Sequence, residues 1–459
     1  MIEPGPSASM LVAGKQSSSP RAAFNAICIQ TKIKARHRQV MILLLFLPIF
    51  FSIFRYIPGL EWTLDVAIFA TVILAIATWR WIPSSFNIYI LIVSLVIPIW
   101  GAVCASLVFS QPLWLGLATQ RAYLLALFAL SIGRLISRRW ITLSEIGKAF
   151  IILAWINLAC CAPVVLFLDP NQYNDVGALV SDGGGVYNQF NLPLVFIVFG
   201  AFYYTGLWFN TNRIKHLAIS APFFLYIFGG NSGRILNISV ISAVIFLAFM
   251  GSPRKRRAGN IFNILGVLVV VAGLASLAAP EKFNTMVAKY ADAFMAIDGQ
   301  DAVDDPSANA RILQTAIALP LITGNVVAGT GSISNRWNEG YKGLLGYFHP
   351  SDLGLLGVVF VYGSIGLLFF SVQYIFAWRF GKKLIPTLHS HSESILLLAI
   401  MAYLLFVLVS SITTGAYAFA PEQSLFFLAL LHAGLGMRPS PIRSVEKTRS
   451  IQLDMQHHA

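Results

Sequence analysis

The chain has 459 residues, of which 57% are hydrophobic and only 11% are charged, and its mean hydropathy is +0.72. This composition excludes an ordinary soluble domain, because apolar runs of about twenty residues, the length that crosses a bilayer, recur along the sequence. The formal net charge of +13 does not indicate a nucleic-acid-binding protein, since no basic stripe interleaves with aromatic residues.

The polar N-terminal segment, residues 1–39, contains GKQSSSPR and predicts a disordered cytoplasmic tail. It lacks a small-residue cleavage site after a short apolar core, so we expect no removable signal peptide. A membrane domain over residues 40–437 and a short polar cytoplasmic tail over 438–459 are expected to follow.

Twelve apolar runs in the membrane domain predict an all-α polytopic membrane protein. Backbone groups in lipid must be hydrogen-bonded within the chain, so each run is expected to be a helix. The runs are Val40–Phe54, Thr63–Trp79, Ile88–Phe109, Ala122–Ile136, Phe150–Leu168, Leu192–Phe209, Leu217–Phe228, Ile235–Met250, Ile261–Ala278, Leu353–Trp378, Ile395–Thr413 and Ser424–Leu435.

The orientation of these spans follows from Lys and Arg. With the N-terminus in the cytoplasm, the cytoplasmic segments carry 24 of the 32 basic residues and the outer segments carry 8. This threefold bias predicts that both termini are cytoplasmic, and it favours an even number of spans.

Two outer loops are long enough to carry chemistry. Asp169–Asn191 is rich in Gly and Asn, and Ala279–Asp352 is about seventy residues long with most of the outer charges. A loop of this size is expected to contain short helices and to handle a substrate. Its Asp304 and Asp305 lack the spacing of a calcium loop, so no metal is expected.

Three arginines stand at the outer ends of predicted helices. Arg234 closes FGGNSGR at the start of a span, where the helix dipole disfavours a cation unless an anion binds between them. Arg311 opens an amphipathic loop helix with Ile312, Ala316, Ile317 and Leu319, and Arg121 starts an earlier span. Each arginine is either an interfacial anchor or part of a pyrophosphate clamp, because guanidinium binds phosphate oxygens bidentately.

His349 lies in GYFHPSDLGLLG, immediately before an apolar span. Ser351 or Asp352 is expected to cap the helix of that span. His349 is then either a general base or a structural polar residue, and Asp352 is either the competing base or the group that orients His349.

Three motifs together resemble the O-antigen ligase and O-antigen polymerase superfamily of bacterial surface-polysaccharide assembly. They are GGNSGRILNISVISAVIFLAFMGSPRKRR, ARILQTAIALPLITGNVVAGTGSISN and HPSDLGLLGVVFVYGSIGLLFF. Their order, the twelve spans and the large late outer loop are similar to that family, chiefly over residues 235–370.

The resemblance implies an enzyme of the bacterial inner membrane that transfers a glycan from undecaprenyl pyrophosphate on the periplasmic face without a metal or other cofactor. Arg234 and Arg311 match the family's pyrophosphate-binding arginines, and His349 matches its general base. The implied partners are the lipid-linked glycan, membrane lipid, and chain-length regulator and flippase proteins, with no nucleic acid.

The sequence leaves three functions open. Polymerisation of repeat units into exopolysaccharide or O-antigen is the main expectation. A ligase that moves glycan to lipid A-core is the second, although Pro350 stands where ligases usually have Asn. A flippase for lipid-linked sugars is the third, and it would need ionisable groups at mid-membrane.

Overall fold

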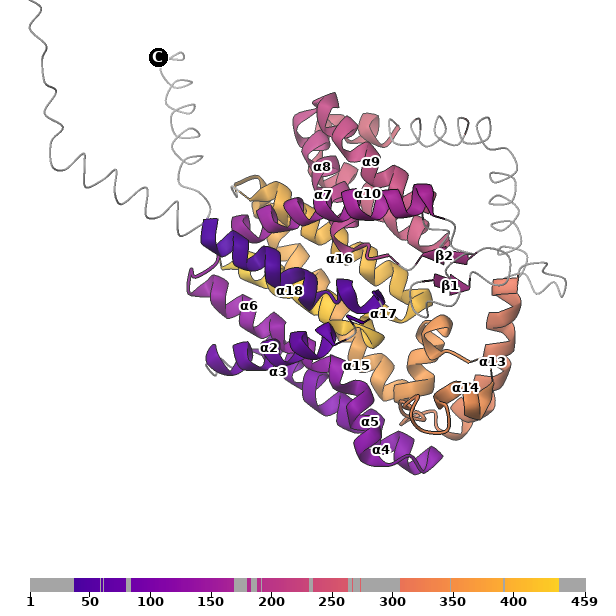
Figure 1. Cartoon of the computed structure of the whole chain (residues 1–459). Helices are drawn as coiled ribbons and strands as arrows, with labels where there is room; N and C mark the ends of the chain where they lie inside the picture. The colour runs from indigo at the N-terminus through magenta and orange to yellow at the C-terminus, as the bar shows by residue number, and fades with distance from the viewer. Residues whose placement is uncertain are drawn as a thin grey trace, which may run out of the picture.

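In the part of the chain that the structure describes, the computed structural model is helical apart from one pair of short strands (Figure 1). Strands β1 (Val180–Asp182) and β2 (Asn188–Phe190) pair antiparallel between α7 and α8, in the first of the two long loops that the sequence predicts to be outside. The structure describes residues 37–57, 59–60, 62–79, 84–168, 180–182, 188–190, 192–230, 234–262, 306–346, 348–390 and 393–436, with positions 266 and 273 besides.

The helices follow the predicted apolar runs. Their bounds are His37–Phe50, α2 Thr63–Ala77, α3 Ser85–Leu91, α4 Ile97–Phe109, α5 Leu113–Thr119, α6 Leu127–Ser137, α7 Leu143–Phe167, α8 Val195–Thr211, α9 Ile214–Gly230, α10 Arg234–Gly251, α13 Pro306–Gly324, α14 Gly340–Leu345, α15 Leu355–Leu384, α16 Ser394–Thr414, α17 Ala416–Phe419 and α18 Pro421–Leu435. A π-helical stretch, η2 (Ile92–Val96), joins α3 to α4, and a 3-10 stretch, η3 (Gln120–Ala126), joins α5 to α6.

Every predicted span except Ile261–Ala278 falls on a described helix, and most of that one lies outside the described residues. Five helices are long and apolar enough to cross a membrane, namely Ser85–Phe109, Leu113–Ser137, Leu143–Val165, Leu355–Leu388 and Ser394–Thr414. The other apolar helices are shorter. The fold is therefore that of a multi-pass membrane protein, and twelve crossings remain a prediction.

The centre of the bundle is built on α16 and α18. Both are apolar on all sides and largely buried, as expected for helices surrounded by protein. Phe426 of α18 stacks on Phe128 with ring centroids 5.6 Å apart, and Phe427 lies 4.2 Å from Tyr403 of α16. The short predicted span Ser424–Leu435 is thus an interior helix.

The outer surface of the bundle is apolar. Leu107, Phe167 and Leu368 are among many large side chains that are more than two-thirds exposed, and only lipid makes such a surface favourable. Some exposed tryptophans stand near the ends of helices, where the membrane interface is expected. Trp62 comes just before α2 and Trp79 just after it.

Helices α2 and α6 run side by side in the same direction. Asp65 at the start of α2 pairs with Arg121 of η3, and the carbonyl of Thr78 after α2 accepts from Arg134 near the end of α6. The two contacts are thirteen residues apart on the α2 side, from 65 to 78, and thirteen residues apart on the α6 side, from 121 to 134. The two helical segments therefore stay in register. The two helices therefore cross in the same direction, and the predicted orientation, in which both start on the outer side, stays a prediction.

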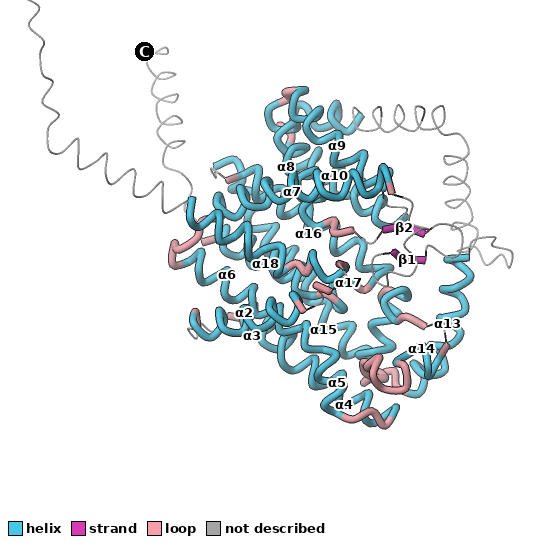
Figure 2. The backbone as a smooth tube through the Cα atoms, in the orientation of Figure 1, coloured by secondary structure: helices cyan, strands magenta, loops and turns pink. Residues whose placement is uncertain are grey.

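Helix α15 is broken at Gly363, whose φ of 70° and ψ of −176° are not helical. The irregular segment 325–334 lies between α13 and α14, in the part of the tube drawn as loop (Figure 2). It supplies the hydrogen bonds that the break removes. The N–H groups of Thr330 and Gly331 donate to Phe360 and Val361, at 2.7 and 2.9 Å, and the N–H of Ser364 donates to Val326 at 2.8 Å.

Backbone that is not helical is tolerated at membrane depth only when protein satisfies its polar groups, and the 325–334 segment does so here. A Cβ atom at position 363 would lie 2.1 Å from the carbonyl oxygen of Val327, so the close approach requires glycine. The last part of the large outer loop is therefore built into the bundle.

Two side chains hold the 325–334 segment by hydrogen bonds. Gln111 donates to the carbonyl of Ser332 at 3.2 Å and accepts from the N–H of Ser334 at 2.7 Å. The Tyr341 hydroxyl donates to Gly331 at 2.9 Å, and burial raises the pKa of this phenol, which keeps its proton in place. The segment is a fixed part of the fold.

Candidate functional site

His349 is held against α13 by one hydrogen bond. Its backbone N–H donates to Oε1 of Gln314 at 3.1 Å, and Gln314 is only 1% exposed. The side chain of His349 is exposed. The imidazole thus stands at the surface on a backbone that the buried amide fixes.

Arg311 lies one turn before Gln314 on α13, and residues three apart share a helix face. Its side chain is exposed, like that of His349. The Gln314 contact therefore joins the turn that carries His349 to the helix that carries Arg311. A guanidinium and an imidazole so placed are suited to anion binding beside proton transfer.

Helix α13 packs on the protein through Gln314, Ala318 and Ile322, which are buried and spaced four apart. Of the expected apolar face, Ile312 and Leu319 are 57% and 52% exposed, whereas Ile317 is partly buried against the core. The exposed part of that face would contact lipid if the helix lies at the membrane surface, as the sequence predicts.

The predicted cap of α15 is wrong. Pro350–Leu353 forms a 3-10 turn, η7, with His349 at its N-cap position, and the N-cap of α15 is Gly354. Neither Ser351 nor Asp352 caps the long helix, because the chain turns sharply at Gly354, with φ 57°. A Cβ there would lie 2.3 Å from the carbonyl oxygen of Ile412 near the end of α16.

Asp352 shares the η7 turn with His349. Its N–H donates to the carbonyl of His349 at 3.0 Å, and its carboxylate is exposed. The turn therefore presents an imidazole and a carboxylate three residues apart at the same end of the bundle.

Arg234 is the first residue of α10, and its side chain lies outside the described residues. A Cβ built on Gly251, the last residue of α10, would lie 3.9 Å from Cδ1 of Leu398 near the start of α16, so the two helices, which pack along their length, are antiparallel. The start of α10 is therefore level with the end of α16, on which Gly354 packs. The backbone of Arg234 emerges at the same end of the bundle as His349, Asp352 and Arg311.

Arg121 is engaged elsewhere. Its Nε donates to Asp65 at 2.7 Å, with side chains 48% and 58% exposed, and its Nη1 donates to the carbonyl of Ala118 at 2.9 Å. Exposed ion pairs contribute at most about 1 kcal/mol, so this pair does not exclude an anion. The structure supplies a partner that the sequence did not indicate, and a phosphate-binding role for Arg121 stays a prediction.

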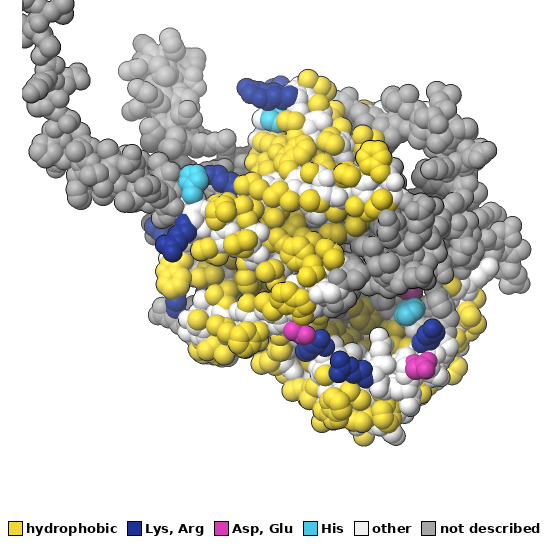
Figure 3. All heavy atoms as spheres, in the orientation of Figure 1, with side chains coloured by type: hydrophobic (Ala, Val, Ile, Leu, Met, Phe, Trp, Pro, Cys, Tyr) yellow, Lys and Arg dark blue, Asp and Glu magenta, His cyan; other side chains and the backbone are white. Residues whose placement is uncertain are grey.

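The surface around the candidate site is polar on an otherwise apolar molecule. Charged side chains and a histidine lie on both sides of a hollow on the lower part of the face in Figure 3, one group where Figure 1 places α5 and α15 and the other where it places α14. The loop and α14 add the exposed side chains of Arg336, Glu339 and Lys342. Among the described residues, no group of three or more His, Cys, Asp or Glu is placed to hold a metal ion.

No protein-family model matches the chain, and no curated protein shows significant similarity to it. The resemblance to the O-antigen ligase and polymerase superfamily therefore rests on the three sequence motifs.

Proposed function

We propose that this chain is an integral membrane glycosyltransferase that polymerises undecaprenyl-pyrophosphate-linked repeat units into exopolysaccharide or O-antigen. The observation that carries the proposal is the hydrogen bond from the backbone N–H of His349 to Gln314, because it joins the turn that carries His349 to α13, the helix that carries Arg311. The type of reaction is inferred from the resemblance of the three motifs to the O-antigen ligase and polymerase superfamily.

In the proposed reaction, an acceptor hydroxyl attacks the sugar carbon that carries the pyrophosphate. His349 takes the hydroxyl proton as the new C–O bond forms, while Asp352 either orients the imidazole or replaces it as base. The bond between that carbon and the pyrophosphate oxygen breaks, and Arg311 and Arg234 stabilise the charge on the leaving oxygen.

The distribution of buried charge favours an enzyme over a flippase. In the described part of the chain, the buried charged side chains are Arg134 and Glu145. Arg134 lies in the last turn of α6, and Glu145 closes a capping box at the start of α7. Both are explained by helix ends, whereas a transporter is expected to place ionisable groups at mid-membrane.

Glycan analysis of a strain that lacks this chain tests the proposal. We expect single repeat units still attached to their acceptor and no long chains. Free long polymer beside an undecorated lipid core would indicate a ligase instead. Precursor retained on the cytoplasmic side would indicate a flippase, and an unchanged glycan profile would refute all three functions.

A further inference from the structure

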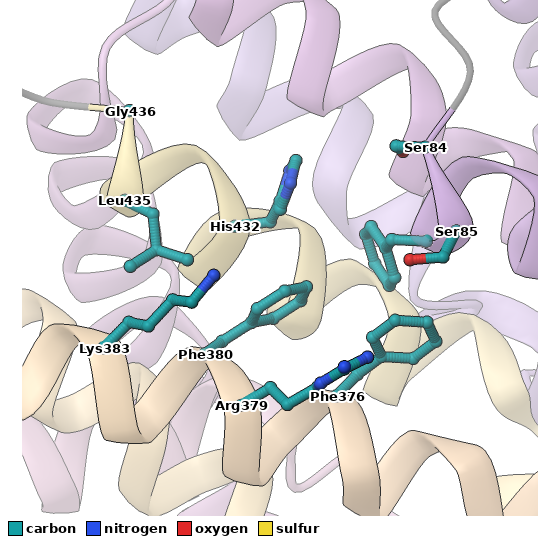
Figure 4. A pocket seen from close by; sticks show the side chains of 10 residues that line it. Ser84, Ser85, Phe376, Arg379, Phe380, Lys383, His432, Leu435 and Gly436 are labelled. Carbon is teal, nitrogen blue, oxygen red and sulfur yellow. The ribbon is translucent and has the colours of Figure 1, made fainter.

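A second polar site lies at the other end of α15. A pocket of about 740 Å³ opens between the start of α3, the last turns of α15 and the end of α18 (Figure 4). Twenty-five residues separate Gly354 from Arg379 in this pocket, and the two parts of α15 on either side of the break at Gly363 together contain about 35 Å of helix. That length is close to the thickness of a bilayer core, so the pocket and the candidate site belong to opposite membrane faces.

Two basic side chains give the pocket positive charge. Arg379 and Lys383 of α15 and His432 of α18 line it, and none of its described lining residues is acidic. Arg379 and Lys383 are four residues apart, so they share one helix face, where like charges repel. An anion between them would turn this repulsion into attraction.

One wall of the pocket is aromatic and rigid. Phe86, Phe376 and Phe380 are buried, and the ring of Phe86 lies 5.2 and 5.4 Å from the other two. The imidazole of His432 is set against this wall, 5.5 Å from Phe86 and 5.1 Å from Phe380. The pocket therefore combines a cationic rim with an apolar surface, as an amphiphilic ligand requires.

The depth of the pocket matches the membrane interface. Trp378, next to Arg379, is 69% exposed, and Trp79 and Trp140 are also more than half exposed. Trp79 and Trp140 belong to the same end, since Arg134 near the end of α6 lies over Trp79 and Arg138 lies over Trp140. Tryptophan is enriched at headgroup level, so the pocket opens among lipid headgroups.

We propose that this pocket binds the phosphate group of an anionic phospholipid. Arg379 and Lys383 neutralise the phosphate, and His432 and the Ser85 hydroxyl add hydrogen-bond donors. The Phe86–Phe376–Phe380 wall packs against the apolar part of the lipid. This site is separate from the proposed glycosyl transfer and does not depend on it.

Binding of lipid to the purified full-length chain tests the proposal. The protein in uncharged detergent is titrated with phosphatidylglycerol or phosphatidylcholine, and occupancy is read by native mass spectrometry. We expect saturable binding of phosphatidylglycerol and weaker binding of phosphatidylcholine. The double variant Arg379→Gln/Lys383→Gln should bind phosphatidylglycerol about 30-fold more weakly, since each basic residue near an anionic lipid contributes roughly fivefold.

Lys382→Gln is the matched control, because Lys382 is exposed on the same turn of α15 but does not line the pocket. It should bind like the wild type, and Arg379→Lys/Lys383→Arg should retain most of the affinity. Wild-type binding by the Gln double variant, or equal binding of the two lipids, would overturn the proposal. Full displacement of the lipid by millimolar inorganic phosphate would assign the pocket to a soluble phosphate instead.

Discussion

At the scale of single residues, the site depends on which group accepts the proton. We expect His349→Ala to lower turnover about 10²–10⁴-fold, the usual effect of losing a general base, with normal protein yield. The assay uses lipid-linked donor in vitro at matched protein level. Asp352→Asn is the comparison variant from the same turn. Full activity in His349→Ala would leave this residue a structural role only, and a larger loss in Asp352→Asn would make Asp352 the base.

Gln314 is a positioning residue at the same scale, because it touches the backbone of His349 and not the reacting groups. Gln314→Met removes the acceptor, and the lost bond is worth about 1 kcal/mol. We expect turnover to fall in the wild-type background and to stay unchanged in the His349→Ala background, since the imidazole that Gln314 positions is then absent. Equal losses in both backgrounds would contradict this role.

At the scale of elements, the break in α15 makes a sharp stability prediction. Gly363→Ala introduces a Cβ 2.1 Å from the carbonyl oxygen of Val327 in a conformation that costs a side chain about 1–3 kcal/mol. We expect a large fall in melting temperature and yield. Gly381→Ala on the same helix is the control, because its Cβ meets only Met401 Cε, at 3.4 Å. Equal stability of the two variants would show that the break is not fixed.

The elements also show what sequence can predict. Apolar runs indicate helices well, because lipid leaves the backbone no other solution. The break at Gly363 lies inside the continuous apolar run Leu353–Trp378, and its hydrogen-bond partners are some 35 residues upstream, so no local pattern marks it. No local pattern marks the hydrogen bond between Gln314 and His349 either, because the two residues are far apart in the sequence. The one signal in the sequence that pointed to the contact between Gln314 and His349 is Gln314 itself, a polar residue among the small and apolar residues of an amphipathic helix.

At the scale of the whole molecule, the prediction is orientation. The 24-to-8 distribution of basic residues places the 325–339 segment outside and the turn after α10 inside. Single cysteines at Asn335 and Lys255, both exposed positions, test this in a background without Cys28, Cys104, Cys160 and Cys161. We expect a membrane-impermeant reagent to label position 335 in intact cells and position 255 only after lysis. The reverse pattern would invert the topology.

The broken helix α15 also has a consequence for the order of biogenesis. The break in α15 leaves backbone N–H and C=O groups without hydrogen bonds inside the helix, and such groups are costly in lipid. Helix α15 therefore cannot adopt its final conformation in the membrane without the segment that binds these groups. The 325–334 segment that covers the break leaves the ribosome before α15, and Gly101 of α4, whose carbonyl accepts from Ser332 at 3.2 Å, is made far earlier. Synthesis from the N-terminus therefore produces α4 first, then the 325–334 segment and finally the broken helix α15. A circular permutant that begins at α15 would have to insert that helix before the 325–334 segment has been synthesised.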